Sequence, residues 1–187
     1  EVFFKRIEPE KHLGYLSLYI MFFPQIVAGP IEHPQNMLPQ FRQYFNFDYQ
    51  QTVDGLVLIA LGFLKKLVIA DRLALIANRV FNNPSGFDGI QTAIGVLFFS
   101  LQIYSDFSGY SDIAIGVAQV FGIRIMENFR QPYFSRSVTE FWQRWHISFS
   151  TWLRGYIFFP LSRRLRAPAV RWTAIVITFL ITGLWHG

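Results

Sequence analysis

The stretch "FWQRWHISFSTWLRGYIFFPL", residues 141–161, places one histidine among tryptophans, phenylalanines and a tyrosine. Ser137 and Glu140 have the spacing of a capping box, which predicts that a helix begins there. On a wheel of about 100° per residue starting at Val138, an apolar face within about 60° on either side contains residues 141, 142, 145, 149, 152, 153 and 156. We expect this amphipathic helix to lie in a membrane interface or to line a polar cavity.

Two histidines stand in apolar surroundings, His146 in this stretch and His186 in the final "GLWHG". His146 lies about 80° from the start of the wheel, at the edge of the apolar face, where an imidazole can border a cavity. His186 follows Arg171 by 15 residues (186 − 171), a helical rise of about 22 Å within a hydrocarbon layer about 30 Å thick. Burial at that depth favours a neutral imidazole, which can accept a proton.

Each of these histidines, taken alone, also fits a structural role. Together they would form a base with an assisting partner. We expect no metal site, because histidines forty residues apart (186 − 146) lack a local ligand motif and no further ligands are evident. His12 and His33 lie in polar stretches and are given no role.

The composition favours a membrane protein. Of the 187 residues, 52% are hydrophobic and 16% are charged, whereas soluble domains contain roughly 25% charged residues. The absence of cysteine excludes disulfides and thiolate metal sites within this sequence. Between Arg124 and Arg171, nine arginines accompany two acids among bulky apolar residues. This pattern is typical of cytoplasmic membrane-flanking loops and does not favour nucleic-acid binding.

The apolar residues gather in four regions: residues 13–30, 53–81, 89–123 and 170–187. Prolines or charged residues interrupt the first three, for example Pro24, so none is a simple span of about 20 apolar residues. Helices with such interruptions pack around protein and cavities, because lipid-facing positions would not tolerate them. We expect an all-α polytopic membrane protein and interpret this sequence as a fragment. Residues 161–168 are expected to form an aqueous loop.

Two polar clusters lie inside the apolar regions. In "YSDFSGYSD" (104–112), Asp106 and Asp112 do not share a helical face, so a paired-carboxylate site is not supported. A break between two helices at Gly109 is favoured instead. A second cluster is expected to form a helix end at the headgroups, with local ion pairs: Lys65, Lys66, Asp71 and Arg72.

Taken together, four stretches resemble the membrane-bound O-acyltransferase (MBOAT) family: "FFPQIVAGPIEHPQNMLPQ" (22–40), "YSDFSGYSDIAIGVAQVFGI" (104–123), "NFRQPYFSRSVTEFWQRWHISFSTWLRGYIFFPL" (128–161) and "GLWHG" (183–187). Their order is most similar to the bacterial branch that includes the alginate O-acetylase membrane subunit. The R-W-H-x-S-F-S-x-W-L-R block followed by W-H-G is the most specific part of the resemblance.

The resemblance implies a ring of transmembrane helices around a tunnel. Residues 1–187 would be a single partial domain that lacks the N-terminal helices and the part after the W-H-G motif. It also implies that His186 is the principal catalytic residue and His146 the second. Six further residues are expected along the substrate tunnel: Trp145, Ser148, Trp152, Arg154, Trp185 and Asp106.

The implied reaction moves an acyl group, with acetyl expected, from a cytoplasmic thioester donor such as acetyl-CoA to a hydroxyl of an extracytoplasmic polysaccharide such as alginate. His186 would be the general base and His146 would assist. No bound cofactor and no nucleic acid are expected. The implied setting is a multi-pass protein of the bacterial inner membrane, in contact with lipid and a periplasmic acyltransferase partner, although direct one-step transfer stays open.

Two alternatives compete with the acyltransferase. The first is a transporter or flippase subunit in which Asp106, Asp112 and the histidines line a proton or substrate path. The second is a structural membrane scaffold without catalytic histidines.

Overall fold

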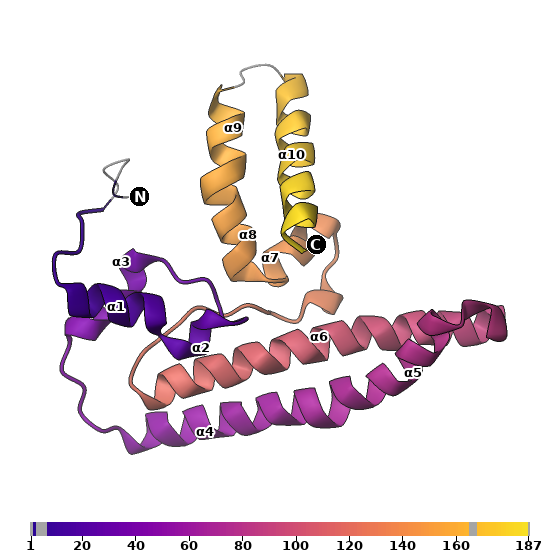
Figure 1. Cartoon of the computed structure of the whole chain (residues 1–187), viewed down its shortest axis with the longest axis horizontal. Coiled ribbons are helices and arrows are strands. Elements are labelled where there is room, and N and C mark those ends of the chain that lie inside the picture. The colour runs from indigo at the N-terminus through magenta and orange to yellow at the C-terminus, as the bar shows by residue number, and fades with distance from the viewer. Residues whose placement is uncertain (1, 3–6, 165–167, 187) are drawn as a thin grey trace. The chain divides into compact units, whose positions relative to one another are not determined.

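The computed structural model describes residues 2, 7–164 and 168–186, and every regular element within these ranges is helical (Figure 1). The chain divides into two compact units, Glu1–Glu127 and Asn128–Gly187. The first unit contains α1 (Leu13–Met21), α2 (Phe23–Ile26), α3 (Pro34–Met37), η1 (Gln40–Arg42), α4 (Tyr49–Phe63), η2 (Leu64–Ala70), α5 (Asp71–Asn82), η3 (Pro84–Gly86) and α6 (Gly89–Val120). The second contains η4 (Pro132–Phe134), α7 (Val138–Arg144), α8 (Ile147–Leu153), η5 (Arg154–Phe158), α9 (Phe159–Arg164) and α10 (Pro168–His186).

Two long antiparallel helical segments form the base of the first unit. α4, η2 and α5 follow one another directly and pack along α6 (Figure 1). Two glycine pairs bring the backbones together: a Cβ on Gly62 would lie 2.6 Å from the carbonyl oxygen of Gly109, and one on Gly116 would lie 2.5 Å from that of Gly55. Because the glycines in each helix are about two turns apart, both close contacts fall on one face.

The helix break expected at Gly109 is wrong, because α6 continues from Gly89 to Val120. Gly109 faces α4 at the position where a side chain would collide with the backbone of Gly62. The missing Cβ therefore serves a close approach between two helices and does not bend one. Ser105, Ser108 and Ser111 of α6 are also buried.

The helix end expected at Lys65–Arg72 is also wrong, although the expected local ion pair is confirmed. Lys66 Nζ lies 2.9 Å from Asp71 Oδ1 and 2.8 Å from Asp106 Oδ1. Lys65 Nζ lies 2.5 Å from Asp112 Oδ2. The helix continues through the π-helical η2 because α6 supplies carboxylates to both lysines, which then have charged partners without a helix end.

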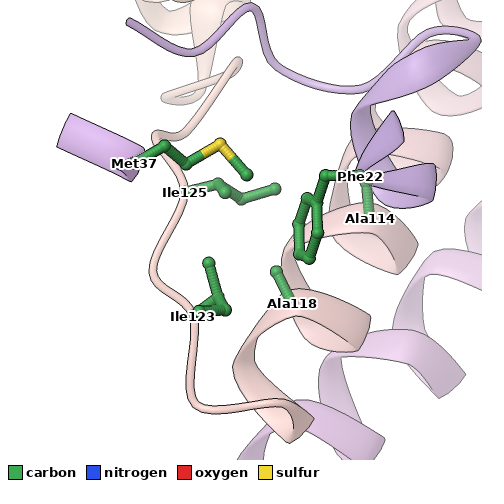
Figure 2. Packing of buried hydrophobic residues seen from close by; sticks show 6 residues of the cluster. All are labelled: Phe22, Met37, Ala114, Ala118, Ile123 and Ile125. Carbon is green, nitrogen blue, oxygen red and sulfur yellow. The ribbon is translucent and has the colours of Figure 1, made fainter. Parts of the chain in front are cut away.

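A small apolar core joins the N-terminal helices to the end of α6 (Figure 2). Phe22 lies where the chain bends between α1 and α2, just before Pro24, which confirms the interruption expected there. The core consists of Phe22, Met37, Ala114, Ala118, Ile123 and Ile125. Beside it the buried carboxylate of Glu32 accepts hydrogen bonds from Asn36 Nδ2 (2.7 Å) and from the backbone N–H of Met126.

In the second unit α8, η5 and α9 run from Ile147 to Arg164 as one helical segment beside α10 (Figure 1). The aqueous loop expected over residues 161–168 is wrong for residues 161–164, which belong to α9, and for Pro168, which is the first residue of α10. Residues 165–167 lie outside the described residues. Helix α10 carries the W-H-G histidine in its last turn, as the sequence predicts.

Within the described ranges, none of the helices has the combination of length and hydropathy that crossing a bilayer requires. Large apolar side chains are nevertheless exposed on α4, α5, α6 and α10. On α10, Leu180 is 68% exposed and Leu184 is 84% exposed. These helices therefore present apolar faces that the described part of the chain does not cover.

Replacement of Gly109 by alanine tests the close approach of α4 and α6. The new Cβ would lie 2.7 Å from the Gly62 carbonyl oxygen, so the helices must separate. We expect a destabilisation of about 1–3 kcal/mol, measured as a lower thermal melting temperature of the purified complete protein. Gly89→Ala is the matched control on the same helix, because its Cβ meets nothing within 4 Å. Equal melting temperatures for the two variants would contradict the close packing.

Candidate functional site

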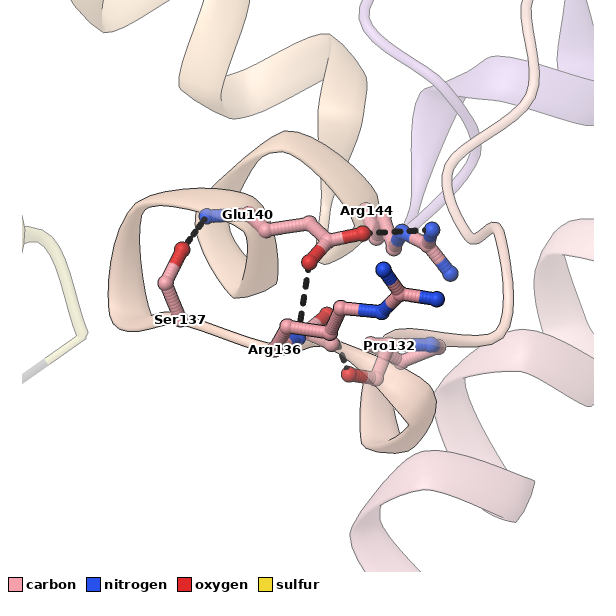
Figure 3. A network of polar contacts seen from close by, with 6 residues as sticks. Pro132, Arg136, Ser137, Glu140 and Arg144 are labelled. Atoms are coloured by element: carbon pink, nitrogen blue, oxygen red, sulfur yellow. Dashed lines mark hydrogen bonds and ion pairs between the residues drawn. The ribbon is translucent and has the colours of Figure 1, made fainter.

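The site begins with a capped helix at the position that the sequence predicts. Ser137 Oγ accepts a hydrogen bond of 3.1 Å from the Glu140 N–H, so Ser137 is the N-cap of α7 (Figure 3). The Glu140 carboxylate accepts from the Arg136 N–H at 2.7 Å and pairs with Arg144 Nη2 at 2.6 Å. Glu140 thereby ties the start of α7 to its last turn.

The continuous helix expected over 137–156 is wrong, because the chain leaves the helical conformation at His146. α7 ends at Arg144, His146 has the left-handed angles φ 43° and ψ 56°, and α8 begins at Ile147. A non-glycine residue in this region costs about 1–3 kcal/mol. The break at His146 interrupts the constant rotation of about 100° per residue on which the helical wheel from Val138 depends. The single apolar face derived from that wheel therefore does not extend from α7 into α8.

A neighbouring segment stabilises this break. The Arg130 N–H donates to the Arg144 carbonyl at 2.9 Å, and the Ile147 N–H donates to the Asn128 carbonyl at 2.9 Å. Each of these backbone groups would have a partner within α7–α8 in an uninterrupted helix. The segment therefore replaces the helical hydrogen bonds that the break removes.

Phe149 contacts both candidate histidines. Its ring stacks on His146 with centroids 4.9 Å apart and meets His186 edge-on at 5.8 Å. Trp152 and Trp185 complete the cluster, with their centroids 6.3 Å apart. The structure thus brings together both predicted catalytic histidines and two of the predicted tunnel residues.

The hydrogen bond of His186 sets its tautomer. Nδ1 lies 2.7 Å from the carbonyl oxygen of Thr182, one turn earlier in α10. A carbonyl oxygen only accepts, so Nδ1 carries the hydrogen. In the neutral ring Nε2 then has the lone pair, which is the arrangement that a general base requires.

His146 is held in its neutral form. Burial of the imidazole and, to a lesser extent, the charge of the nearby His186 lower the pKa of His146 to about 4 from its usual value near 6.5. At neutral pH His146 is therefore a neutral hydrogen-bonding group.

Two further predicted tunnel residues, Trp145 and Ser148, have contacts of a different kind. Trp145 packs on Phe141, Phe129 and Tyr133. Ser148 is buried, and its hydroxyl donates to Asn128 at 2.6 Å.

Arg154 and Asp106 belong to different units of the chain. The exposed Arg154 lines a groove in the second unit. Asp106 belongs to the first unit, where its carboxylate pairs with Lys66.

A groove of about 320 Å³ adjoins the histidine cluster. Phe149, which stacks on His146, and Thr182, whose carbonyl holds His186, both line it. The other lining residues are apolar or aromatic at five positions, Trp142, Leu153, Phe158, Ile175 and Phe179, and polar at five, Thr139, Gln143, Ser150, Arg154 and Thr178. The groove can accept a mainly apolar group next to a basic side chain.

Three residues that organise the site were not singled out from the sequence: Asn128, Phe149 and Thr182. The proximity of Thr182 to His186 could have been predicted from the sequence, because a residue four positions before His186 in a helix lies one turn away from it. Phe149 was recognised only as one member of the apolar face. Asn128 gave no signal, since its contact with Ser148 spans 20 residues. Within the described residues no group of three His, Asp or Glu side chains could hold a metal ion.

Comparison with known proteins extends these observations. Residues 12–187 match the model of the membrane-bound O-acyltransferase family (MBOAT). A probable alginate O-acetylase of Pseudomonas fluorescens is 41% identical over 179 residues, which is 95% of this chain and 35% of the relative. A peptidoglycan O-acetyltransferase of Helicobacter pylori is 39% identical over 180 residues, 94% of this chain and 34% of the relative.

A teichoic acid D-alanyltransferase of Bacillus subtilis is 29% identical over 193 residues, which is 94% of this chain and 47% of the relative. The chain therefore spans about a third of the length of the O-acetyl-transferring relatives and about half of this one.

Nuclear magnetic resonance of the complete protein, labelled with carbon-13 at histidine, tests the environment of His146. We expect its ring signal to titrate with a midpoint near pH 4, so that the ring stays neutral above about pH 5. In His186→Ala the midpoint should rise but stay below 6.5, because burial is the larger cause. An unfolded histidine binds its proton at higher pH, so this group destabilises the folded state as the pH falls below about 6.5. A midpoint near 6.5 in the unmodified protein would contradict the buried environment.

Proposed function

Because the chain belongs to the membrane-bound O-acyltransferase family, we propose that it forms the histidine-bearing part of an enzyme that O-acylates a cell-envelope polysaccharide. The names of its relatives support this proposal, since they include a probable alginate O-acetylase and a peptidoglycan O-acetyltransferase. The names of these two relatives support acetyl as the acyl group. The teichoic acid D-alanyltransferase shows that a related chain carries another acyl group.

One observation supports this function above the others: the imidazoles of His146 and His186 both contact the ring of Phe149. His186 presents Nε2 as an acceptor because Nδ1 donates to Thr182. His146 is neutral at pH 7 and still carries one N–H group that can donate. A base and a neutral donor are the two groups that acyl transfer to a hydroxyl requires.

In the proposed reaction Nε2 of His186 takes the proton of the acceptor hydroxyl while the hydroxyl oxygen attacks the thioester carbonyl carbon. A C–O bond forms and the C–S bond breaks. The thiolate leaves with the electron pair of that bond and receives the proton from the His186 imidazolium. His146 donates a hydrogen bond to the negative charge that develops on the carbonyl oxygen.

The groove beside the cluster is the proposed place for the acyl donor. Its apolar lining suits the acyl and thioester part of the donor. The Arg154 guanidinium suits a phosphate, which is present in acetyl-CoA and in carrier-bound thioesters. We propose acetyl-CoA or another acyl thioester as the donor and no bound cofactor.

The proposed setting is a multi-pass protein in the bacterial inner membrane. The outward apolar side chains of α4, α5, α6 and α10 support contact with lipid or with further membrane helices. With the donor on the cytoplasmic side and the polysaccharide on the other side, the acyl group would have to pass through the membrane. The expected tunnel would provide that path. A periplasmic acyltransferase that completes the transfer is the proposed partner.

The transporter alternative has less support. It would place Asp106 and Asp112 along a proton or substrate path, but each carboxylate is paired with a lysine. Family membership and the paired histidines favour the acyltransferase instead.

Ester-linked acetate on extracted cell-envelope polysaccharide tests this proposal. It would be measured in cells with the wild-type complete protein, His186→Ala or His146→Ala at matched protein levels. General acid–base assistance is worth about 10²- to 10⁴-fold, so both variants should lose most of the acetate, and the affected polymer identifies the acceptor.

His12→Asn is the control for this experiment. His12 Nδ1 accepts a hydrogen bond from the Tyr15 N–H at the start of α1, and asparagine can form the same cap. This variant should keep its acetate. Unchanged acetate in both His186→Ala and His146→Ala would contradict the acyltransferase proposal and would favour the transporter or scaffold alternative.

A further inference from the structure

The start of α8 has an unusual source of capping hydrogen bonds. The first N–H groups of a helix lack partners within it, and the N-cap side chain commonly accepts one of them. His146 occupies the N-cap position of α8, but its side chain accepts no capping hydrogen bond. Another residue must therefore accept the first N–H groups of this helix.

Asn128, 18 residues before His146 (146 − 128), provides these acceptors. Its carbonyl oxygen accepts from the Ile147 N–H at 2.9 Å. Its side-chain Oδ1 accepts twice from Ser148, from the N–H at 3.3 Å and from the hydroxyl at 2.6 Å. Asn128 thus satisfies the first two N–H groups of α8 from outside the helix.

Both members of this contact are shielded from water. Asn128 is 1% exposed and Ser148 is 0% exposed. Buried hydrogen bonds are well defined in geometry, because each group that lost its partner would also be cut off from water. The backbone on both sides of the contact is therefore held in one arrangement.

We propose that Asn128 and Ser148 are positioning residues for the His146 imidazole. They cap α8 in place of His146, so the ring is not used for capping and stacks on Phe149, which His186 also contacts. They also stabilise the left-handed backbone of His146, since Ile147 and Ser148 are the next two residues. This inference rests on the proposed function for its catalytic consequence, but not for its geometry.

Four variants of the complete protein in proteoliposomes test the catalytic consequence, with thiol release from acetyl-CoA as the measured reaction. Misplacement of a catalytic group by about 1 Å can cost about 10²-fold. We therefore expect turnover to fall about tenfold in Ser148→Ala and about 100-fold in Asn128→Ala, with the KM for acetyl-CoA changed less than about twofold.

Two further variants serve as rescue and control. Asn128→Asp keeps an oxygen that can accept both hydrogens of Ser148, so it should retain turnover within about threefold of wild type. Ser162→Ala removes a hydroxyl that donates to the Phe159 carbonyl in α9, and it should leave turnover unchanged. A loss of folding would instead lower the melting temperature and the amount of active protein.

The histidine ring signals provide a second readout that needs no activity. The His146 signal should move in Ser148→Ala and Asn128→Ala but not in Ser162→Ala. If wild type releases no thiol from acetyl-CoA, that donor assignment in the proposed function fails, while the ring signal still tests the positioning. The proposal would be overturned if the His146 ring signal stays in place in both Ser148→Ala and Asn128→Ala. It would also be overturned if the wild-type enzyme is active and both of these variants keep its turnover.

Discussion

The hydrogen bonds between Asn128–Arg130 and the α7–α8 junction are the constraint on which the candidate site depends. The sequence from Ser137 onward is compatible with one amphipathic helix, and only the competing bonds to Arg144 and Ile147 interrupt it. The interruption places His146 in the left-handed region and restarts the helix with a new phase. As a result Phe149, one turn later, stacks on His146 and also meets His186 of α10.

The two histidines differ because their local surroundings differ. His186 is fixed by a single hydrogen bond along its own helix, which leaves Nε2 as the acceptor. His146 is held mainly by burial, which keeps it neutral. In the proposed reaction this difference would let one histidine act as the base and the other as a hydrogen-bond donor.

Close backbone contact has the same organising effect in the first unit. The glycine pairs of α4 and α6 allow an approach that side chains would prevent. That approach lets Lys65 and Lys66 reach carboxylates of α6, so the charged residues lie within the helix pair and do not end a helix. Gly109 in "YSDFSGYSD" thus has a packing role and does not mark a break in the helix.

The sequence by itself determined the helical class, the start of α7 at Ser137, the bend before Pro24 and the choice of His146 and His186 as candidates. These features depend on bonds within about one helical turn or on recognisable motifs. Only the tertiary structure decided the break at His146, the partner of Gly109 and the burial of Ser148. Those features depend on contacts between residues 14 or more positions apart in the sequence. The local pattern carries no information on them, because either a helix or a break satisfies the same neighbouring residues.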